Sequence, residues 1–263
     1  MKTPITIIFV IVFILELKAQ HYTHDIGVLA GSTSLQTDYG ERSHFGSELN
    51  NKGVSFSVAH YLSFYNRTLR WDPNNTMHNH IMVKTELQYI NNTELRHHGT
   101  YATRRTYSGE QLRAMKGSLS MINAGVHLEY FLRPLEEFVY PYSDMLFNPF
   151  FTFGFQYSFY KNGLESELGD WEQNPSLLPD KYALANSLAI GKGQSFAFNI
   201  GFGTRYKLTK RIDLVGQLNY MYFFSDKIDG LKAEVFENKN NEWALNLQFG
   251  FIYHLNFSSP LFY

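Results

Sequence analysis

Residues 151–159 read Phe-Thr-Phe-Gly-Phe-Gln-Tyr-Ser-Phe, with an aromatic side chain at every second position and small or polar residues between. Side chains of a β-strand point alternately to its two faces. The segment therefore predicts a strand with one aromatic face and one small, polar face. Such a strand separates two different environments.

The same alternation recurs in two longer segments. In residues 196–208, mostly aromatic and aliphatic positions alternate with Ala, Asn, Gly, Arg and Lys. In residues 243–257 the apolar series starts at Trp243 and ends at Phe257. Strands of globular proteins have about five or six residues, whereas a strand that crosses a bilayer needs about nine to eleven in the apolar zone. The lengths therefore favour membrane-spanning strands.

Weaker runs complete a set of about eight strands, an even number that suits an antiparallel, up-and-down transmembrane β-barrel. Closure matters because an open sheet edge in lipid would leave backbone N–H and C=O groups without partners. The predicted strands lie near residues 24–35, 53–65, 79–91, 118–132, 149–161, 194–208, 211–225 and 241–257.

The connections predict an orientation. Residues 36–52, 92–117, 162–193 and 226–240 form long, polar connections, whereas the turn at Thr209-Lys210 is tight. Outer-membrane barrels have long external loops and short periplasmic turns. We therefore expect both termini in the periplasm.

The N-terminus reads as an export signal. Lys2 is followed by the apolar run from Ile5 to Leu15 and by Lys18-Ala19-Gln20. A charged start, a short apolar run and a small residue at the cut are typical of a signal peptide. We predict a signal over residues 1–19 and one barrel domain over residues 20–263, in the outer membrane of a Gram-negative bacterium.

Composition excludes several classes of function. The chain has no cysteine, which rules out disulfides, thiolate catalysis and Cys-ligated zinc. Its formal net charge of −1 argues against a nucleic-acid partner. Aromatic residues make up 17%, which suits a lipid-facing wall with interfacial girdles.

The polar face of the predicted strands carries charges. Buried charges need opposite partners nearby, and an eight-stranded barrel has an interior just wide enough to be filled by side chains. We therefore predict an internal salt-bridge cluster that plugs the lumen. Its members are Lys84, Glu86, Glu129, Arg205, Lys207, Asp213 and Asp25.

A soluble, lipocalin-like ligand binder is the main structural alternative, because it has the same alternation with the faces inverted. The nearly unbroken apolar face and the small residues opposite it favour the membrane. So does the position of Trp243, Tyr160 and Tyr206 near strand ends, where interfacial girdles lie.

Four stretches resemble a Bacteroidota group of small outer-membrane barrels: the end of the export signal at Lys18-Ala19-Gln20, His24-Asp25-Ile26-Gly27-Val28, residues 222–230 and residues 249–255. The layout is similar to the PorG-type barrel of the type 9 secretion system. The resemblance implies no catalytic residues. Outer-membrane barrels often end on an aromatic residue of the last strand, and here either Phe257 or Tyr263 is expected to be the assembly signal.

Histidines offer little chemistry at sequence level. His97-His98 and the pair His78 and His80 lack the spacing of a zinc site, so we expect solvated loop residues and no metal. His44, with Ser43 or Ser47, could mimic the rim site of a lipid-modifying barrel. Residues 180–190 could form a short amphipathic helix in an external connection.

We therefore expect a barrel with a plugged lumen that acts as a structural or accessory subunit, in secretion or envelope assembly. It would contact the lipid bilayer and envelope or secretion proteins, with no cofactor and no catalytic residues. The alternatives are a lipid-modifying enzyme, a narrow channel or a transporter of hydrophobic ligands.

Overall fold

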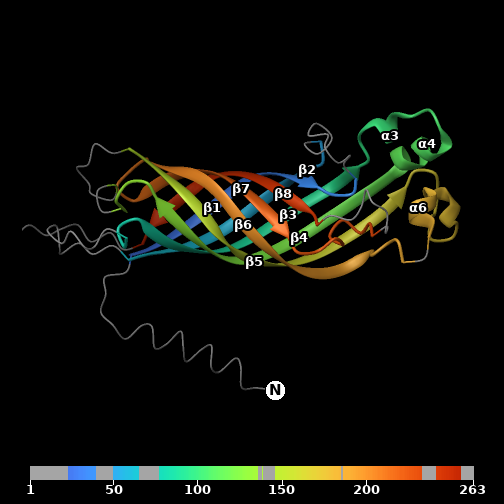
Figure 1. The fold of residues 1–263 in the computed structure, drawn as a ribbon. Helices are drawn as coiled ribbons and strands as arrows, with labels where there is room; N and C mark the ends of the chain where they lie inside the picture. Colours follow the sequence, from blue (N-terminus) through green and yellow to red (C-terminus); the bar gives the residue numbers. More distant parts are fainter. Residues whose placement is uncertain are drawn as a thin grey trace, which may run out of the picture.

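The computed structural model describes residues 23–39, 50–64, 77–135, 138, 146–184, 186–232 and 241–255. Within them, eight antiparallel strands form one closed barrel (Figure 1). The strands are β1 (Thr23–Gln36), β2 (Lys52–Ser63), β3 (Ile81–Arg96), β4 (Met115–Phe131), β5 (Phe147–Ser166), β6 (Gly191–Lys207), β7 (Ile212–Phe223) and β8 (Trp243–His254). The short helices are α3 (Thr100–Thr103), α4 (Tyr107–Ala114), the 3₁₀ turn η1 (Pro175–Leu177) and α6 (Asp180–Ala183).

Each strand pairs with its neighbours in the chain, and β1 pairs with β8 to close the barrel. Asp25 lies opposite His254 at one end of this pair, and Gln36 lies opposite Trp243 at the other. We call the first the terminal end and the second the loop end. The short helices extend from the loop end (Figure 1). Closure leaves the described strands without a free edge, which a bilayer requires.

The two faces of the wall are chemically opposite. On β5, Phe151, Phe153 and Phe155 are exposed on the outside, with Phe155 61% accessible. Thr152 and Gln156, which alternate with them, point inward and are buried. The aromatic face is therefore the outer one. A soluble ligand-binding barrel has the inverse arrangement, so the lipocalin-like alternative is excluded.

The structure confirms an eight-stranded antiparallel barrel. It also extends some strands beyond the expected bounds: β5 runs to Ser166 and β3 to Arg96, paired with β4 as far as Met115 and Lys116. Because these extensions lie at the loop end, the barrel continues there beyond the part of its wall that is apolar on the outside. None of the helices among the described residues is long and apolar enough to span a membrane.

Two local expectations were wrong. Tyr160 is not a girdle residue: it points inward, is 7% accessible, and its ring packs on Gly193. The helix expected over residues 180–190 is the single turn α6, which ends at Ala183. Leu188 instead forms a bridge with Leu231, because this connection is held by a neighbouring loop rather than by its own helical periodicity.

Candidate functional site

The lumen is the candidate functional site, because its contents decide whether the barrel can act as a conduit. Inward-pointing side chains fill it in three layers along the barrel axis. A charged layer, packed among a cluster of buried apolar side chains that includes Leu29, Phe150 and Ile252, lies toward the terminal end. An amide layer lies in the middle, and an apolar layer lies at the loop end. Each layer is built differently.

Arg205 is the centre of the charged layer. It is 1% accessible, although it is among the largest side chains of the chain. Its Nη2 lies 3.0 Å from Glu129 Oε2, and its Nη1 lies 3.9 Å from Asp25 Oδ2. The guanidinium also stacks 4.4 Å from the ring of Tyr61 and 5.0 Å from that of Phe131. The buried charge is thus compensated by carboxylates and by aromatic faces.

Lys84 continues this network on β3. Its Nζ lies 3.1 Å from Glu86 Oε2 and 3.7 Å from Glu129 Oε1. Glu86 in turn lies 3.6 Å from His127 Nε2. The carboxylate of Glu129 therefore connects the lysine to the arginine, and all these side chains are buried.

His254 extends the network on the other side. Its Nδ1 lies 2.9 Å from Asp25 Oδ1, and its Nε2 lies 3.0 Å from Asp213 Oδ2. The imidazole thus joins two carboxylates from β1 and β7. The complete chain of contacts, which we call the charged chain, is His127, Glu86, Lys84, Glu129, Arg205, Asp25, His254 and Asp213.

Six of the seven charged residues expected in the lumen lie in the charged chain. Lys207, the seventh, is half-buried at the end of β6, with its Nζ 5.2 Å from the ring of Phe138. The sequence reasoning left out His127 and His254, although both occupy inward positions of their strands. Phe257 and Tyr263, the expected assembly signal, lie outside the described residues.

The amide layer consists of side chains that bond one another across the lumen. Gln217 accepts a hydrogen bond from Lys84 Nζ at 3.4 Å and donates to Gln248 Oε1 at 2.9 Å. Gln248 donates to Ser57 Oγ at 2.8 Å. Two residues earlier on the same strand, β8, Asn246 Oδ1 accepts from Ser55 and Thr33. This network links the middle of the lumen to the charged chain.

The apolar layer, which we call the cap core, closes the loop end. Its buried side chains come from strands and from loops that lie far apart in the sequence. Tyr39 and Tyr182, both almost fully buried, lie beside the half-buried His97, with ring centroids 4.7 and 6.0 Å from that of the imidazole. Burial lowers the pKa of His97 to about 3. The expectation of a solvated loop histidine was therefore wrong for His97.

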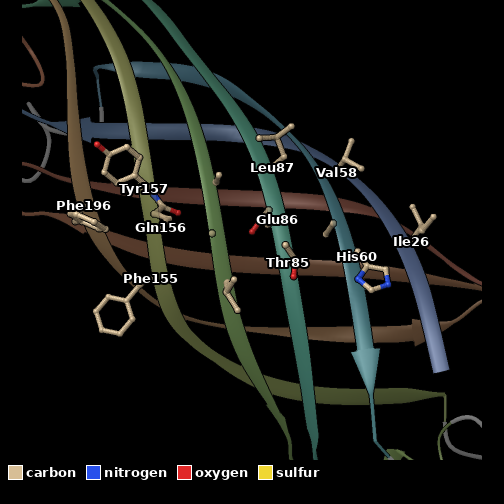
Figure 2. A pocket seen from close by; sticks show the side chains of 14 residues that line it. Ile26, Val58, His60, Thr85, Glu86, Leu87, Phe155, Gln156, Tyr157 and Phe196 are labelled. Atoms are coloured by element: carbon tan, nitrogen blue, oxygen red, sulfur yellow. The ribbon is translucent and has the colours of Figure 1, made fainter. Parts of the chain in front are cut away.

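The outer wall carries an open depression of about 900 Å³. Figure 2 shows that Leu87, Phe155, Tyr157 and Phe196 project around it on the outer face, whereas Glu86 belongs to the lumen side. The small side chains Thr85 and Ala124 lie on the same face as these large ones. The lining is mostly apolar, as expected for a wall in contact with acyl chains.

The remaining histidines make no metal centre among the described residues. No group of three or more His, Asp or Glu side chains there could hold an ion. His80 bonds the carbonyl of Phe131 at 2.6 Å, and His24 stacks on His60 on the outer face. The proposed rim site of His44, Ser43 and Ser47 lies outside the described residues.

No protein-family model matches the chain, and no curated protein matches it in sequence. Several solved structures resemble it. Neisserial surface protein A is 12% identical with a TM-score of 0.43, over 88% of this chain and 96% of that one. A major outer membrane protein of Thermus thermophilus is 13% identical with a TM-score of 0.48, over 88% and 99%. Ail, the attachment invasion locus protein of Yersinia pestis, is 9% identical with a TM-score of 0.40, over 89% and 97%.

At these identities and scores, the likeness assigns no activity. The architecture follows from the chain's own strands, which form a closed antiparallel barrel that is apolar outside and polar inside. Transmembrane β-barrels of bacterial outer membranes are built in this way. This chain therefore has the fold of an outer-membrane β-barrel.

Proposed function

We propose that the protein is a structural or accessory subunit of the outer membrane of a Gram-negative bacterium, acting in secretion or envelope assembly. The observation that carries this proposal is the filled lumen. Charged, amide and apolar layers succeed one another along the axis, and their side chains are buried. A barrel filled in this way contributes its wall and its loops rather than a conduit.

The loops at the loop end supply a surface for a partner. The turn between α3 and α4 is ordered by Arg113, which donates to the carbonyls of Ala102 and Arg104, and by the N-cap Thr106. Tyr101 and Tyr107 are 54% and 63% accessible on either side of this turn. Exposed tyrosines on a rigid element are typical of protein interfaces. We propose that this surface, which we call the α3–α4 surface, faces outside and contacts an envelope or secretion protein.

The alternatives have less support. A narrow channel or a transporter of hydrophobic ligands needs a path through the lumen, which the three layers occupy. A lipid-modifying enzyme would depend on His44 and the serines near it, for which the described residues offer no geometry. The PorG-like layout and the Bacteroidota origin stay part of the proposal, and they favour a secretion role.

The proposal is tested by site-specific photo-crosslinking in intact cells. A photoreactive phenylalanine analogue at Tyr101 or Tyr107 should give a discrete adduct with one envelope protein. The matched control places the analogue at Phe249, which is 62% accessible on the lipid-facing wall and should give lipid adducts only. Absence of protein adducts at both tyrosines, with the barrel correctly assembled, would contradict a partner at this surface.

The lumen has its own test in planar bilayers. The folded protein should give no steady single-channel conductance, because buried side chains of the described strands and loops fill the lumen. A stable conductance would show that the plug opens, and the channel alternative would then replace the subunit role.

A further inference from the structure

The segment after β7 folds back over the cap core. Residues 224–232, which we call the closing loop, place Ile228 and Leu231 in the apolar layer with no accessible surface. Gly230 turns the chain with a φ of +88°, and a Cβ there would lie 2.6 Å from Ile190 Cδ1. A side chain is disfavoured at this position both by the left-handed backbone and by the contact.

Two buried carboxyl groups hold the closing loop in place. Asp229 Oδ1 accepts from the N–H of Leu231, and Asp229 Oδ2 accepts from the N–H of Asp38, both at 2.8 Å. Glu242, the residue before β8, accepts from the N–H groups of Ile228 and Asp229 at 3.0 Å. The Glu242 carboxyl, bound to the N–H of Asp229 itself, also lies within electrostatic reach of the Asp229 carboxyl. Together they tie the closing loop to the end of β1 and to the start of β8.

Other contacts complete the closure without adding charge. Asn162 on β5 donates to the carbonyls of Lys227 and Ile228 at 3.0 and 3.1 Å. Its Oδ1 accepts from the N–H of Gly191 at 2.7 Å. The closing loop is therefore fixed at backbone level from several strands, and the carboxyl pair is its ionisable part.

The groups that face the pair do not neutralise it. Within the described residues neither carboxyl takes part in a salt bridge. The titratable side chains around them are Asp38 and Tyr39 from the end of β1, Tyr160 from β5, and Asp226 and Lys232 from the closing loop. Lys232 acts on Asp226, and burial nevertheless raises the pKa of Asp226 to about 6. Backbone N–H donors favour the charged form of the paired carboxyls, but burial and the acidic neighbours outweigh them and oppose a second negative charge.

We propose that Asp229 and Glu242 form a proton-dependent latch, in which a proton shared between the two carboxyl groups keeps the closing loop on the cap core. Loss of this proton leaves two buried carboxylates in contact, and their repulsion releases the loop. The inference concerns the loop end alone and does not depend on the proposed role of the barrel as a subunit.

The direction of the pH effect follows from burial. Burial raises the pKa of Asp229 to about 6, and burial together with the charge of Asp229 raises the pKa of Glu242 well above its ordinary value. A carboxyl group with a raised pKa in the closed state favours closure when it is protonated. Closure therefore weakens as the pH rises through about 6, and it weakens further when Glu242 loses its proton.

The test is hydrogen exchange of the closing loop in the detergent-folded, full-length protein between about pH 5.5 and 9.5, a range that starts below the raised pKa of Asp229 and extends well above the ordinary pKa of a Glu carboxyl. After correction for the intrinsic pH dependence of exchange, protection of the Ile228, Asp229 and Leu231 amides should fall at least roughly tenfold in the wild type. Glu242→Gln imitates the protonated acid, so protection should stay constant within about threefold. Glu172→Gln, an exposed acid of the same cap, is the matched control and should behave as the wild type.

A heat-dependent gel shift first establishes that each variant forms the barrel. If Glu242→Gln does not fold, Asp229→Asn replaces it, because it removes the same charge repulsion and should likewise flatten the profile. Constant protection in the wild type would overturn the latch. So would an equal loss of protection in the wild type and in the folded variants.

Discussion

The two ends of the lumen are filled by different kinds of side chain. Toward the terminal end, the barrel is filled by the charged chain and by the buried apolar cluster around it. The members of the charged chain all project from the strands themselves. At the loop end the barrel is filled by the cap core, to which loops contribute Tyr39, Tyr182 and Ile228. The charged chain is thus part of the barrel wall, whereas the cap core also depends on segments outside the strands.

This difference has an energetic consequence. Removing one partner from a buried ion pair leaves an uncompensated charge, which costs about 3–5 kcal/mol. Opening a loop exposes apolar surface locally and leaves the strand pairing intact, so its free energy can be lower than that of global unfolding. We therefore expect damage to the charged chain to affect the whole barrel, and damage to the cap core to stay local.

The largest expected effect is that of Arg205→Met. It leaves Glu129 and Asp25 without their shared cation in a buried layer, so the barrel should lose about 3–5 kcal/mol of unfolding free energy. Urea unfolding in lipid vesicles, followed by the heat-dependent gel shift, measures the loss.

Two comparisons identify the cause of that loss. Adding Glu129→Gln to Arg205→Met removes the carboxylate that lost its nearer cation and kept only Lys84 at 3.7 Å, so it should recover part of the stability. Arg104→Met, on the exposed turn after α3, should change stability by less than about 0.5 kcal/mol. Equal stability of the wild type and Arg205→Met would show that the charged chain does not determine the stability of the barrel.

A second prediction separates the lipid-facing wall from the water-facing loops. Phe155→Arg places a charge on the outer face of β5 and should cost about 2–4 kcal/mol if that position lies near the middle of the bilayer. Tyr101→Arg, on a side chain that is similarly exposed on α3, should be nearly neutral because water surrounds it. Unfolding in vesicles measures both variants.

The contrast between these two variants is the informative result. An exposed side chain can face lipid or water. The loss of unfolding free energy when it is replaced by arginine distinguishes the two environments. If both arginines are tolerated equally, the aromatic wall is not in contact with acyl chains, and the assignment of the outer face to the membrane fails.

A third prediction addresses the cap core. The ring of Tyr39 packs so closely on Gly117 that a Cβ there would lie 2.5 Å from Tyr39 Cζ. Tyr39→Leu keeps an apolar side chain but loses the ring contacts, at a cost of about 1–3 kcal/mol. Proteolysis in the loop of residues 167–190 should accelerate, while the gel shift of the barrel persists. Loss of the barrel itself would mean that the two ends are one cooperative unit.

Most members of the charged chain could be predicted from the sequence, because strand periodicity determines which side chains point inward. Once Lys84, Glu129 and Arg205 were assigned to the polar face, a closed barrel had to bring them together. The same rule applied to His127 and His254, which occupy inward positions and could have been included. Lys207 was placed on the correct face, but it lies at the rim, where the strand ends.

The loop end could not be derived in this way. Tyr39, Tyr182 and Ile228 come from connections without periodicity, and their contacts depend on how the loops fold over one another. Tyr160 was mispredicted for another reason: its position near the end of the aromatic run suggested a girdle, but it follows the outward-facing Phe159, so strand alternation places it inside. The pairing of Asp229 with Glu242 depends on how the closing loop turns, and no periodic pattern in the sequence predicts that turn.

The smallest expected effect concerns the acid side of cap stability. The lowered pKa of His97, about 3 because of burial, means that its neutral form is favoured in the folded cap. Its contribution is therefore complete above the unfolded value of about 6.5 and is lost as the pH falls toward about 3. The carboxyl pair has the opposite pH dependence, so protection of the cap should pass through a maximum at mildly acidic pH.

The test is His97→Phe, followed by hydrogen exchange of the closing loop. The substitution should remove the loss of protection below the maximum and leave the loss above it unchanged. If protection still falls at acidic pH as in the wild type, His97 is not the group that titrates there.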